Sequence, residues 1–448
     1  MSTVSTIKIH PRLTSGRFNT VRVALVILTQ LVYLSLPWLR WDGRQAVLFD
    51  VDNHRFHVFG AQFLPQDFVY LAALLMVCAL GLFLWTALAG RLWCGYACPQ
   101  TVYTEIMIWI ERLTLGDHKA RRRLQQAPLS AAKAARLALS HGLMLLFSLW
   151  TGFTLAAYFS PANDLAIRAA HLALGPWESF WILFYAGFTY LLATHLREKV
   201  CTHMCPYARF QGAMFDADTL IISYDTKRGE PRGKQVDKQA GHCIDCGICV
   251  QVCPTGIDIR NGLQYECIGC AACIDACDQV MEQLQAPRGL IRYTSENQLN
   301  SARPGSGFGQ HWLRPRVLVY SALLLTILGL SIGSFLNRSP YRVDVLRDRA
   351  ALVRENAEGW LENSYSMRLM NNSDRTQQLQ VSVEGLPGIR LANAGLVQLP
   401  PSQVQTIGLS VQVPPEHAGK GAHDIRFLIR ALDGSGHVLS ESSRFIGE

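Results

Sequence analysis

The chain has 448 residues, of which 49% are hydrophobic and 17% charged, and its formal net charge is +8. This composition is more apolar and less charged than that of an average soluble protein, so it favours a membrane protein with two or three domains. The positive charge is better explained by membrane topology than by nucleic-acid binding, and no nucleic-acid partner is expected. We find no phosphate-binding glycine loop, no flavin or nicotinamide fingerprint and no hydrolase triad.

Five apolar runs are predicted to cross a membrane, because roughly 20 apolar residues span its hydrocarbon core. They are residues 23–38, 68–89, 137–159, 180–196 and 317–336. The first run is short, carries Gln30 and Pro37, and follows a basic stretch as a signal sequence would. No small-residue cleavage pattern follows it, and its PWLRW end is typical of an interfacial aromatic segment, so we interpret it as a span.

The basic residues of the loops indicate which side each loop faces, because short cytoplasmic loops carry an excess of Lys and Arg. The tail up to residue 22 has four basic residues and no acid, and the 91–136 loop has eight basic residues against three acids. The 40–67 loop has three basic residues against four acids. We therefore expect the tail, the 91–136 loop and the segment before the fifth span to be cytoplasmic, with everything after residue 337 outside.

Two cysteine pairs with the same CxxxCP spacing follow the second and fourth spans. WCGYACP contains Cys94 and Cys98, and CTHMCP contains Cys201 and Cys205. At positions i and i+4 of a helical turn two sulfurs share one face, where they can hold a metal ion or meet the opposite pair. Soft thiolates select Cu(I), zinc or the iron of iron–sulfur centres. The alternative is that the four cysteines are buried structural thiols. His203 could add a nitrogen ligand, although the simpler interpretation is that it is an ordinary polar residue.

Eight of the 13 cysteines occur between residues 243 and 277, in two runs of CxxCxxCxxxC. In bacterial two-cluster ferredoxins, three cysteines of each run bind one [4Fe–4S] cluster and the fourth crosses to the other. The spacing therefore predicts one cluster on Cys243, Cys246, Cys249 and Cys277, and a second on Cys267, Cys270, Cys273 and Cys253. A zinc ribbon or a disulfide framework would not need the third cysteine of each run.

Two further features of this segment lead to predictions. Clusters need reduced thiolates, so the segment should face the cytoplasm, in agreement with the loop charges. Pro254 follows the first run, whereas Asp278 stands at the equivalent place after the second. We expect altered local packing there and no missing ligand.

After the fifth span the sequence changes to short alternating strands, broken by turn signals such as DGSG and VPPEH. This pattern predicts a β-sandwich of about immunoglobulin size. The segment has no cysteine, so no disulfide stabilises it and no thiol in it can carry a metal. We interpret it as a docking module. Residues 228–242 and 301–310 are predicted to be polar connectors.

The expected fold class is a multidomain membrane protein. It combines a five-span α-helical bundle, an inserted ferredoxin-like α+β domain and a C-terminal all-β immunoglobulin-like sandwich. The expected division is a cytoplasmic tail (1–22), a four-span domain with the first CxxxCP loop (23–200), a cytoplasmic cluster domain with the second CxxxCP pair (201–315), the fifth span (316–336) and the sandwich (337–448).

Several long strings resemble those of one family. WCGYACPQTVYTE, CTHMCPYARFQGAMFDADTLIISYD, RGEPRG, the double cluster motif and QAPRGLIRYTSE are similar to the membrane ferredoxins called cytochrome c oxidase accessory proteins, the FixG, RdxA or CcoG family. The resemblance extends from the first span to the end of the chain. It implies a bacterial inner-membrane protein with five spans, two cytoplasmic [4Fe–4S] clusters and a periplasmic immunoglobulin-like domain.

The resemblance also implies an activity, the reduction of Cu(II) to Cu(I) for the copper centre of cbb-type haem–copper oxidases. The eight cysteines of the double motif would be cluster ligands, and the four CxxxCP cysteines would be candidate copper or electron-transfer thiols. Copper would then be a substrate or a bound ion. Oxidase subunits and their assembly proteins would be partners beside the lipid bilayer.

Three functions remain open from the sequence. The first is the copper reductase, and the second is a quinol-linked electron relay of the NapH type, whose members lack the fifth span and the outer β domain. The third is a non-enzymatic assembly factor that holds oxidase subunits through its β domain. The electron donor is unknown, and a homodimer is conceivable. Fold and family alone do not decide between these functions.

Overall fold

The computed structural model describes residues 10–63, 67–233, 241–300, 314–348, 353–356, 358–371, 373, 375–393, 395–400, 403–432 and 437–447. The chain divides into two compact units, Met1–Ser331 and Ile332–Glu448. The connector predicted at 301–310 lies outside the described residues, and so does 234–240 within the other predicted connector.

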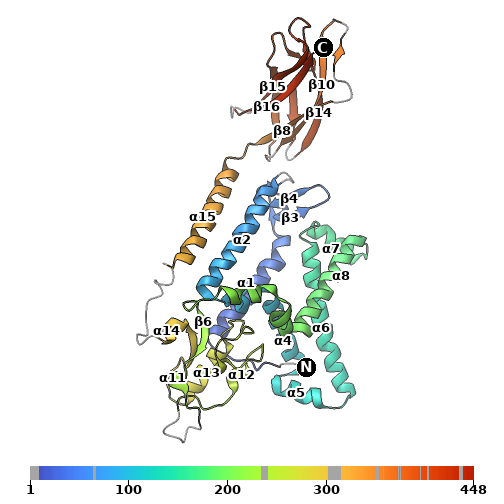
Figure 1. Cartoon of the computed structure of the whole chain (residues 1–448). Helices are drawn as coiled ribbons and strands as arrows, with labels where there is room; N and C mark the ends of the chain where they lie inside the picture. Colours follow the sequence, from blue (N-terminus) through green and yellow to red (C-terminus); the bar gives the residue numbers. More distant parts are fainter. Residues whose placement is uncertain are drawn as a thin grey trace, which may run out of the picture. The chain divides into compact units, whose positions relative to one another are not determined.

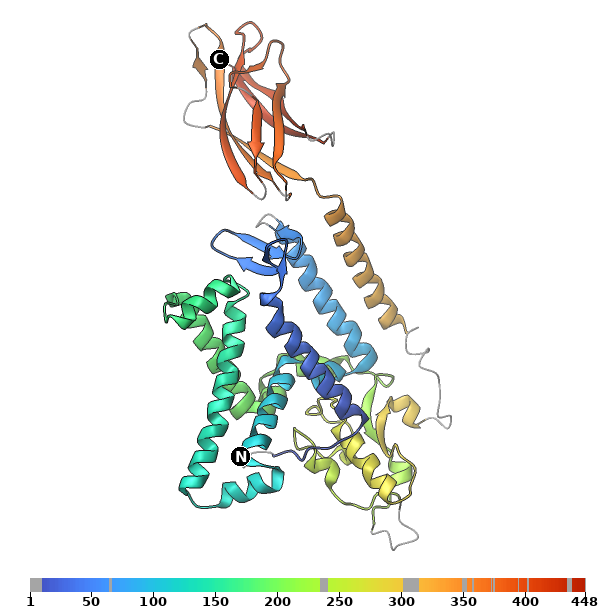
Figure 2. The same ribbon diagram turned by 180° about the vertical axis from the view of Figure 1, so that it is seen from behind.

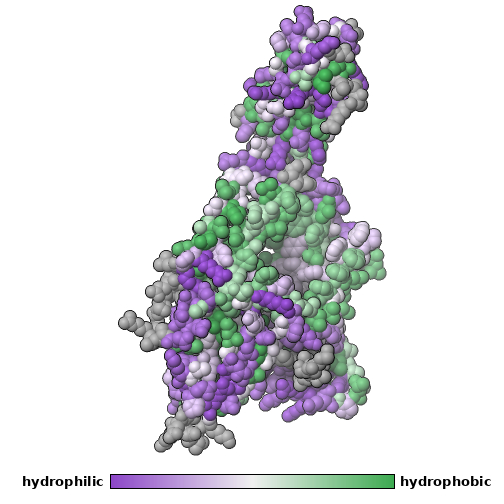
Figure 3. Space-filling view, in the orientation of Figure 1, coloured by the Kyte–Doolittle hydropathy of each residue, from purple (hydrophilic) through white to green (hydrophobic). Residues whose placement is uncertain are grey.

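Five helical segments in the described part of the chain are long and apolar enough to cross a membrane: Arg17–Trp38, Phe68–Ala89, Ala131–Ala156, Pro176–Met204 and Pro315–Leu336. They contain α1 (Arg17–Ser35), α2 (Phe68–Ala89), α6 (Ala131–Ala156), α8 (Pro176–Tyr190) and α15 (Pro315–Leu336). The prediction of five spans is confirmed. Figure 3 shows hydrophobic side chains gathered over these helices, whereas the cysteine-rich part of the same unit is mainly hydrophilic.

The ends of two spans differ from the predicted ones. Helix α6 begins at residue 131 and not at 137, because Ser130 caps it by accepting a hydrogen bond from the backbone N–H of Lys133 (3.2 Å). The fourth span continues beyond α8 through the π-helical segments Leu191–Leu196 and Val200–Met204, on either side of the short α9 (Arg197–Lys199). Hydropathy marks the apolar stretch of a span but not the polar turns that start or extend it.

Short elements connect the spans. Strands β1 (Arg40–Trp41) and β2 (Arg44–Gln45) pair, and β3 (Val47–Asp50), β4 (Arg55–Val58) and β5 (Ala61–Phe63) form a second antiparallel sheet between α1 and α2. Helices α3 (Leu92–Tyr96), α4 (Pro99–Leu115) and α5 (His118–Gln126) link α2 to α6, and α7 (Ala162–Ala170) links α6 to α8. Figures 1 and 2 show α4 beside α6 in both views, in agreement with their contacts.

The cysteine-rich domain is built around a two-stranded antiparallel sheet. Strand β6 (Ile221–Tyr224) pairs with β7 (Ile291–Thr294), and between them lie α11 (Thr226–Gly229), α12 (Ile248–Gln251), a 3₁₀ turn (Ile259–Asn261) and α13 (Ala272–Gln283), with α10 (Pro206–Met214) before and α14 (Glu296–Asn300) after. Buried side chains of Ile222, Ile274 and Ile291 form its core together with cysteines of both runs. The N-terminus of α1 docks here, because the backbone N–H groups of Phe18 and Asn19 donate to the Asp275 carboxylate of α13 (3.2 and 2.7 Å).

The second unit contains two antiparallel sheets that share one core. One sheet has the order β12-β14-β10-β8, with β9 also paired to β10, and the other has the order β13-β11-β15-β16. The strands are β8 (Tyr341–Arg347), β9 (Arg354–Glu355), β10 (Leu361–Asn371), β11 (Gln377–Glu384), β12 (Arg390–Leu391), β13 (Leu396–Leu399), β14 (Val404–Val413), β15 (Gly421–Ala431) and β16 (Val438–Gly447). Buried and exposed residues alternate along β10 and β15, as the period of two requires. The predicted all-β, immunoglobulin-like sandwich is confirmed.

Candidate iron–sulfur and thiol site

Each CxxxCP pair lies at a break between two helical segments. Cys94 is in α3 and Cys98 caps α4, whereas Cys201 is in the second π-helical segment and Cys205 caps α10. In both pairs the second cysteine closes a wide turn to a carbonyl five residues earlier: Cys98 N–H to Trp93 O (3.0 Å) and Cys205 N–H to Val200 O (2.8 Å). The turn is therefore wider than the α-helical one that the spacing suggested.

The prolines of the two motifs have the same role. Pro99 and Pro206 occupy the first positions of α4 and α10. Proline suits this position because its fixed φ is helical and its missing N–H would have no partner within the helix. Each proline therefore starts the helix that follows the cysteine pair.

The four CxxxCP thiols, which we call the thiol site, lie in one neighbourhood. Burial and the thiol of Cys98 raise the pKa of Cys94 to about 11, and Cys205 contributes. Burial also raises the pKa of Cys98, again with a contribution from Cys205. Cys201 is within electrostatic reach of the other three. The fold thus brings together two pairs that are more than 100 residues apart in the sequence.

Gln211 of α10 faces this thiol site from within the protein. The Cys94 thiol donates to its Oε1 at 3.3 Å, and the side chain of Gln211 is completely buried. Its Nε2 has no hydrogen-bond partner in the described part of the chain. A buried amide donor without a partner is costly, so it marks a place where a sulfur ligand or bound group can accept a hydrogen bond.

The eight cysteines of the double motif surround two cavities. The first cluster cavity is lined by Cys243, Cys246, Cys249 and Cys277, and the second by Cys253, Cys267, Cys270 and Cys273. These are the two groups of four that the spacing predicts for two crossing clusters. Cys249 lines both cavities, so they adjoin one another.

The lining of both cavities fits iron–sulfur clusters. Apart from the thiols it is largely apolar, with Ile248 and Val280 at the first cavity and Ile257 and Ile259 at the second. Among the described residues, no three His, Cys, Asp or Glu side chains converge closely enough to hold a single metal ion. Four sulfurs spread around a cavity suit a four-iron cubane, because its iron atoms separate the ligands, whereas one ion draws its ligands together.

Local structure explains why the second cysteine run lacks a proline. Cys273, Cys277 and Asp278 all lie inside α13, which continues to Gln283, and a proline there would remove a helical hydrogen bond. Asp278 instead accepts a hydrogen bond from the backbone N–H of Gly289 (2.8 Å). In the first run the short helix α12 already ends at Gln251, so Pro254 is tolerated.

The thiol site touches the second cluster cavity directly. Cys94 and Cys201 pack, together with Cys273, against the apolar cluster that contains Cys270. A Cβ atom on Gly95 would lie 2.8 Å from both the N and Cα of Cys270, so the two backbones meet where only glycine fits. The two sulfur-bearing sites are therefore neighbours.

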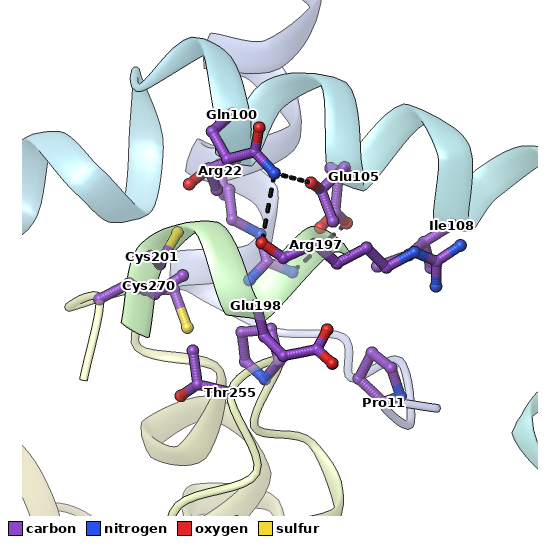
Figure 4. A pocket seen from close by; sticks show the side chains of 14 residues that line it. Pro11, Arg22, Gln100, Glu105, Ile108, Arg197, Glu198, Cys201, Thr255 and Cys270 are labelled. Carbon is purple, nitrogen blue, oxygen red and sulfur yellow. Dashed lines mark hydrogen bonds and ion pairs between the residues drawn. The ribbon is translucent and has the colours of Figure 1, made fainter. Parts of the chain in front are cut away.

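A pocket lies beside this junction (Figure 4). It is lined by Arg22, Gln100 and Glu105 from the helices, by Cys201, and by Thr255 and Cys270 from the cysteine-rich domain. Figure 4 shows Cys201 and Cys270 next to each other at one end of it. The guanidinium of Arg22 and the carboxylate of Glu105 are both buried and lie 3.5 Å apart. The pocket thus joins polar groups of the helices to a cysteine of each sulfur-bearing site.

Among the other residues of the site, one was a weak candidate from the sequence and three were not predicted. His203 is exposed, and its Nδ1 lies 2.6 Å from the hydroxyl of Thr202. Arg91, Gly95 and Gln211 were not singled out, although Gly95 and Gln211 belong to quoted strings and Arg91 lies two residues before the first of them. Their contacts join segments far apart in the chain, and spacing within one segment does not reveal such contacts.

Comparisons with known proteins agree with this architecture. A family model described as "4Fe-4S dicluster domain" matches residues 196–296, and one described as "4Fe-4S binding domain" matches residues 71–122. A third, the "IG-like fold at C-terminal of FixG", matches residues 331–448. Each of the first two matches includes one CxxxCP pair.

Two similar curated proteins cover most of the chain, and a third covers about half of it. Protein RdxA of Cereibacter sphaeroides is 37% identical over 435 residues, which are 95% of this chain and 90% of RdxA. Nitrogen fixation protein FixG of Rhizobium meliloti is 37% identical over 426 residues, 87% of this chain and 81% of FixG. Ferredoxin-type protein NapH of Haemophilus influenzae is 25% identical over 229 residues, 48% of this chain and 68% of NapH.

Five apolar helices, a two-cluster domain and paired thiols beside it define a multi-pass membrane iron–sulfur protein of electron transfer. Its cofactors are iron–sulfur clusters. The full-length likeness makes the family plain: the chain belongs to the FixG-like membrane ferredoxins.

Proposed function

We propose that this protein reduces Cu(II) to Cu(I) for the copper centre of a cbb-type cytochrome c oxidase. The observation that carries the proposal is the contact between the thiol site and the second cluster cavity. Soft thiolates are the ligands that Cu(I) prefers, and bound clusters supply single electrons at low potential. One electron converts one Cu(II) to Cu(I), so two clusters suffice for two copper ions.

The proposed ligands follow from the two cavities and the thiol site. Cys243, Cys246, Cys249 and Cys277 would hold the first cluster, and Cys253, Cys267, Cys270 and Cys273 the second. The remaining four, Cys94, Cys98, Cys201 and Cys205, would hold copper. Because these four thiols do not converge on one point, their side chains would rotate toward the ion on binding. Exposed His203 remains a secondary candidate ligand.

The proposed location is the bacterial inner membrane, with the clusters on the cytoplasmic side and the β-sandwich in the periplasm. The excess of Lys and Arg in the tail and in the 91–136 loop supports this orientation. The β-sandwich would dock to oxidase subunits or their assembly proteins. The electron donor is left open, and a homodimer is compatible with the proposal.

A quinol-linked relay is the second candidate function, and the pocket of Figure 4 favours it. The pocket lies between helices of the membrane domain and Cys270, and it contains the buried carboxylate of Glu105 as a proton acceptor. Oxidation of a quinol releases two electrons and two protons. The two clusters would take one electron each, and the carboxylates of Glu105 and Glu198, which both line the pocket, would take one proton each. The partial likeness to NapH is compatible with this function.

The test is an anaerobic titration of the purified, dithionite-reduced protein with Cu(II). Cluster absorbance and chelator-captured Cu(I) are followed together. We expect the clusters to reoxidise while about two Cu(I) appear per chain, one per cluster electron. Cys94→Ser and Cys201→Ser should retain the clusters but lose copper binding. Cys78→Ser, which changes an exposed cysteine of α2, is the matched control and should behave as the unaltered protein.

The opposite result is equally informative. Clusters that stay reduced when Cu(II) is added would exclude copper as their acceptor. Cluster reduction by a soluble quinol analogue, lost in Glu105→Gln, would then support the relay.

A further inference from the structure

Arg91 joins the three segments that meet at the thiol site. It lies between α2 and α3, and only 7% of it is exposed. Its Nη1 donates to the carbonyls of Tyr265 and Cys267, the latter at 3.3 Å, and its Nη2 donates to the carbonyl of Ala208. One guanidinium thus connects three segments: the first CxxxCP segment, α10 after the second CxxxCP pair, and the loop that contains Tyr265, Cys267 and Gly269, which we call the second cluster loop.

The backbone around Arg91 is packed too closely to move freely. Gly269 of the cluster loop has φ +70°, and a Cβ there would lie 3.0 Å from the carbonyl carbon and oxygen of Arg91. On the other side of this loop, the hydroxyl of Tyr293 donates to the carbonyl of Gly269 (2.6 Å). The cluster loop is therefore held between Arg91 and β7.

The charge of Arg91 is not matched by a carboxylate. Within the described residues no Asp or Glu pairs with it, and its Nε has no hydrogen-bond partner. The other buried arginines of this region each contact a carboxylate: Arg22 pairs with Glu105, and Arg121 and Arg197 share Glu111. Burying an unpaired charge is costly, so a fold that keeps one should have an anion nearby.

The groups within reach of Arg91 that become anionic when they bind a metal are cysteines. Burial raises the pKa of Cys94 and of Cys267, and the positive charge of Arg91 opposes that rise at both thiols. Cys201 is also within its electrostatic reach. When these cysteines act as metal ligands they are thiolates, and Arg91 then has counter-charges on two sides.

We propose that Arg91 is a positioning residue that holds the thiol site against the second cluster loop and, as an unmatched buried cation, favours the reduced state of the second cluster. An added electron makes a thiolate-bound cluster more negative, and a fixed positive charge beside it stabilises that state. The proposal rests on the cluster ligands of the proposed function but not on copper as the acceptor. Its test therefore contains no copper.

The test is an anaerobic redox titration of the full-length protein, with the two clusters followed by electron paramagnetic resonance. Cys246→Ser, which alters only the first cavity, identifies the signal of the first cluster. In Arg91→Gln we expect the ratio of reduced to oxidised second cluster at a fixed potential to fall about tenfold, a shift of about 59 mV for a one-electron couple. Arg91→Lys keeps the charge and should stay within about threefold of the unaltered protein.

Arg260→Gln is the matched control, because Arg260 lines the first cavity and lies near Cys249. It should leave the potential of the second cluster unchanged. An unchanged second potential in Arg91→Gln would overturn the proposal, as would an Arg91→Lys shift as large as that of Arg91→Gln. If Arg91→Gln does not retain its clusters, the cluster content and second-cluster potential of Arg91→Lys decide whether the proposal holds. Loss of the second cluster from both variants would leave Arg91 a purely structural role and also overturn the proposal.

Discussion

At the scale of single residues, Gly95 controls how closely the thiol site approaches the second cluster cavity. It lies between Cys94 and Cys98, and its missing side chain lets its backbone rest on that of Cys270. Neither partner in this contact is a flexible side chain that could swing away. A Cβ atom at this position must therefore push two backbone segments apart.

We predict that Gly95→Ala destabilises the protein by about 1–3 kcal/mol, the usual cost of overpacking a tight contact, and weakens retention of the second cluster. Iron content and thermal unfolding measure the two effects. Gly142→Ala is the control, because Gly142 lies in α6, where an added Cβ would meet no described atom within 4 Å outside its own helical turns. It should be neutral or slightly stabilising, since alanine is the better helix former. Full cluster content and unchanged stability in Gly95→Ala would contradict the predicted contact.

At the scale of elements, α4 and α5 are tied to the end of the fourth span by buried charges. Glu111 of α4 accepts from Arg121 of α5 (2.7 Å) and from Arg197 of α9, and the three side chains are no more than 5% exposed. One carboxylate thus holds two guanidinium groups from different helices. Removing one member of such a group is costly, because the remaining charges stay buried.

We predict that Glu111→Gln lowers the stability of the first unit by about 3–5 kcal/mol, because two buried arginines lose their counter-charge. Thermal unfolding of the purified protein measures this change. Glu282→Gln is the control, because Glu282 pairs with Arg288 at the surface, where the side chains are 48% and 68% exposed. Its effect should stay below about 1 kcal/mol. Equal effects of the two substitutions would show that burial of the ion pairs of Glu111 with Arg121 and Arg197 contributes nothing to stability.

At the scale of the whole molecule, the β-sandwich is built to fold by itself. Its buried core, which includes Tyr365, Leu369 and Phe427, draws only on residues of the second unit. The buried hydroxyl of Tyr341 donates to carbonyls of the same unit, those of Ile429 (2.9 Å) and His437 (2.8 Å). No cluster cysteine belongs to this unit.

We predict that residues 338–448, produced alone, unfold cooperatively as an all-β domain. Phe427→Ala should destabilise this domain by about 3–5 kcal/mol, because Phe427 is completely buried. In the full chain the same substitution should leave iron content unchanged. Circular dichroism and iron analysis test these points, with Arg426→Ala at the neighbouring exposed position as the control. A fragment without cooperative unfolding would contradict the independence of the domain.

Local patterns in the sequence predicted much of the architecture. Apolar length predicts spans because the bilayer sets it, and a period of two predicts strands because successive side chains point to opposite faces. Cysteine spacing predicted two groups of four thiols within 35 residues, and each group lines one cavity, although Cys249 lines both. The assignment of these thiols to two clusters stays a prediction. Each of these signals is contained in a short segment.

Contacts between distant segments were decided only by the tertiary structure. The sequence identifies Cys94 and Cys270 as cysteines of two motifs. It does not reveal that Gly95 packs against Cys270, which lies 175 positions further along the chain. Nor does it reveal that Arg91 is buried without a carboxylate while Arg22, Arg121 and Arg197 each contact one. The physical reason is that periodicity and spacing determine the faces that each element presents. The pairing of those faces, and with it the charge that surrounds each thiol, is decided by the packing of all elements together.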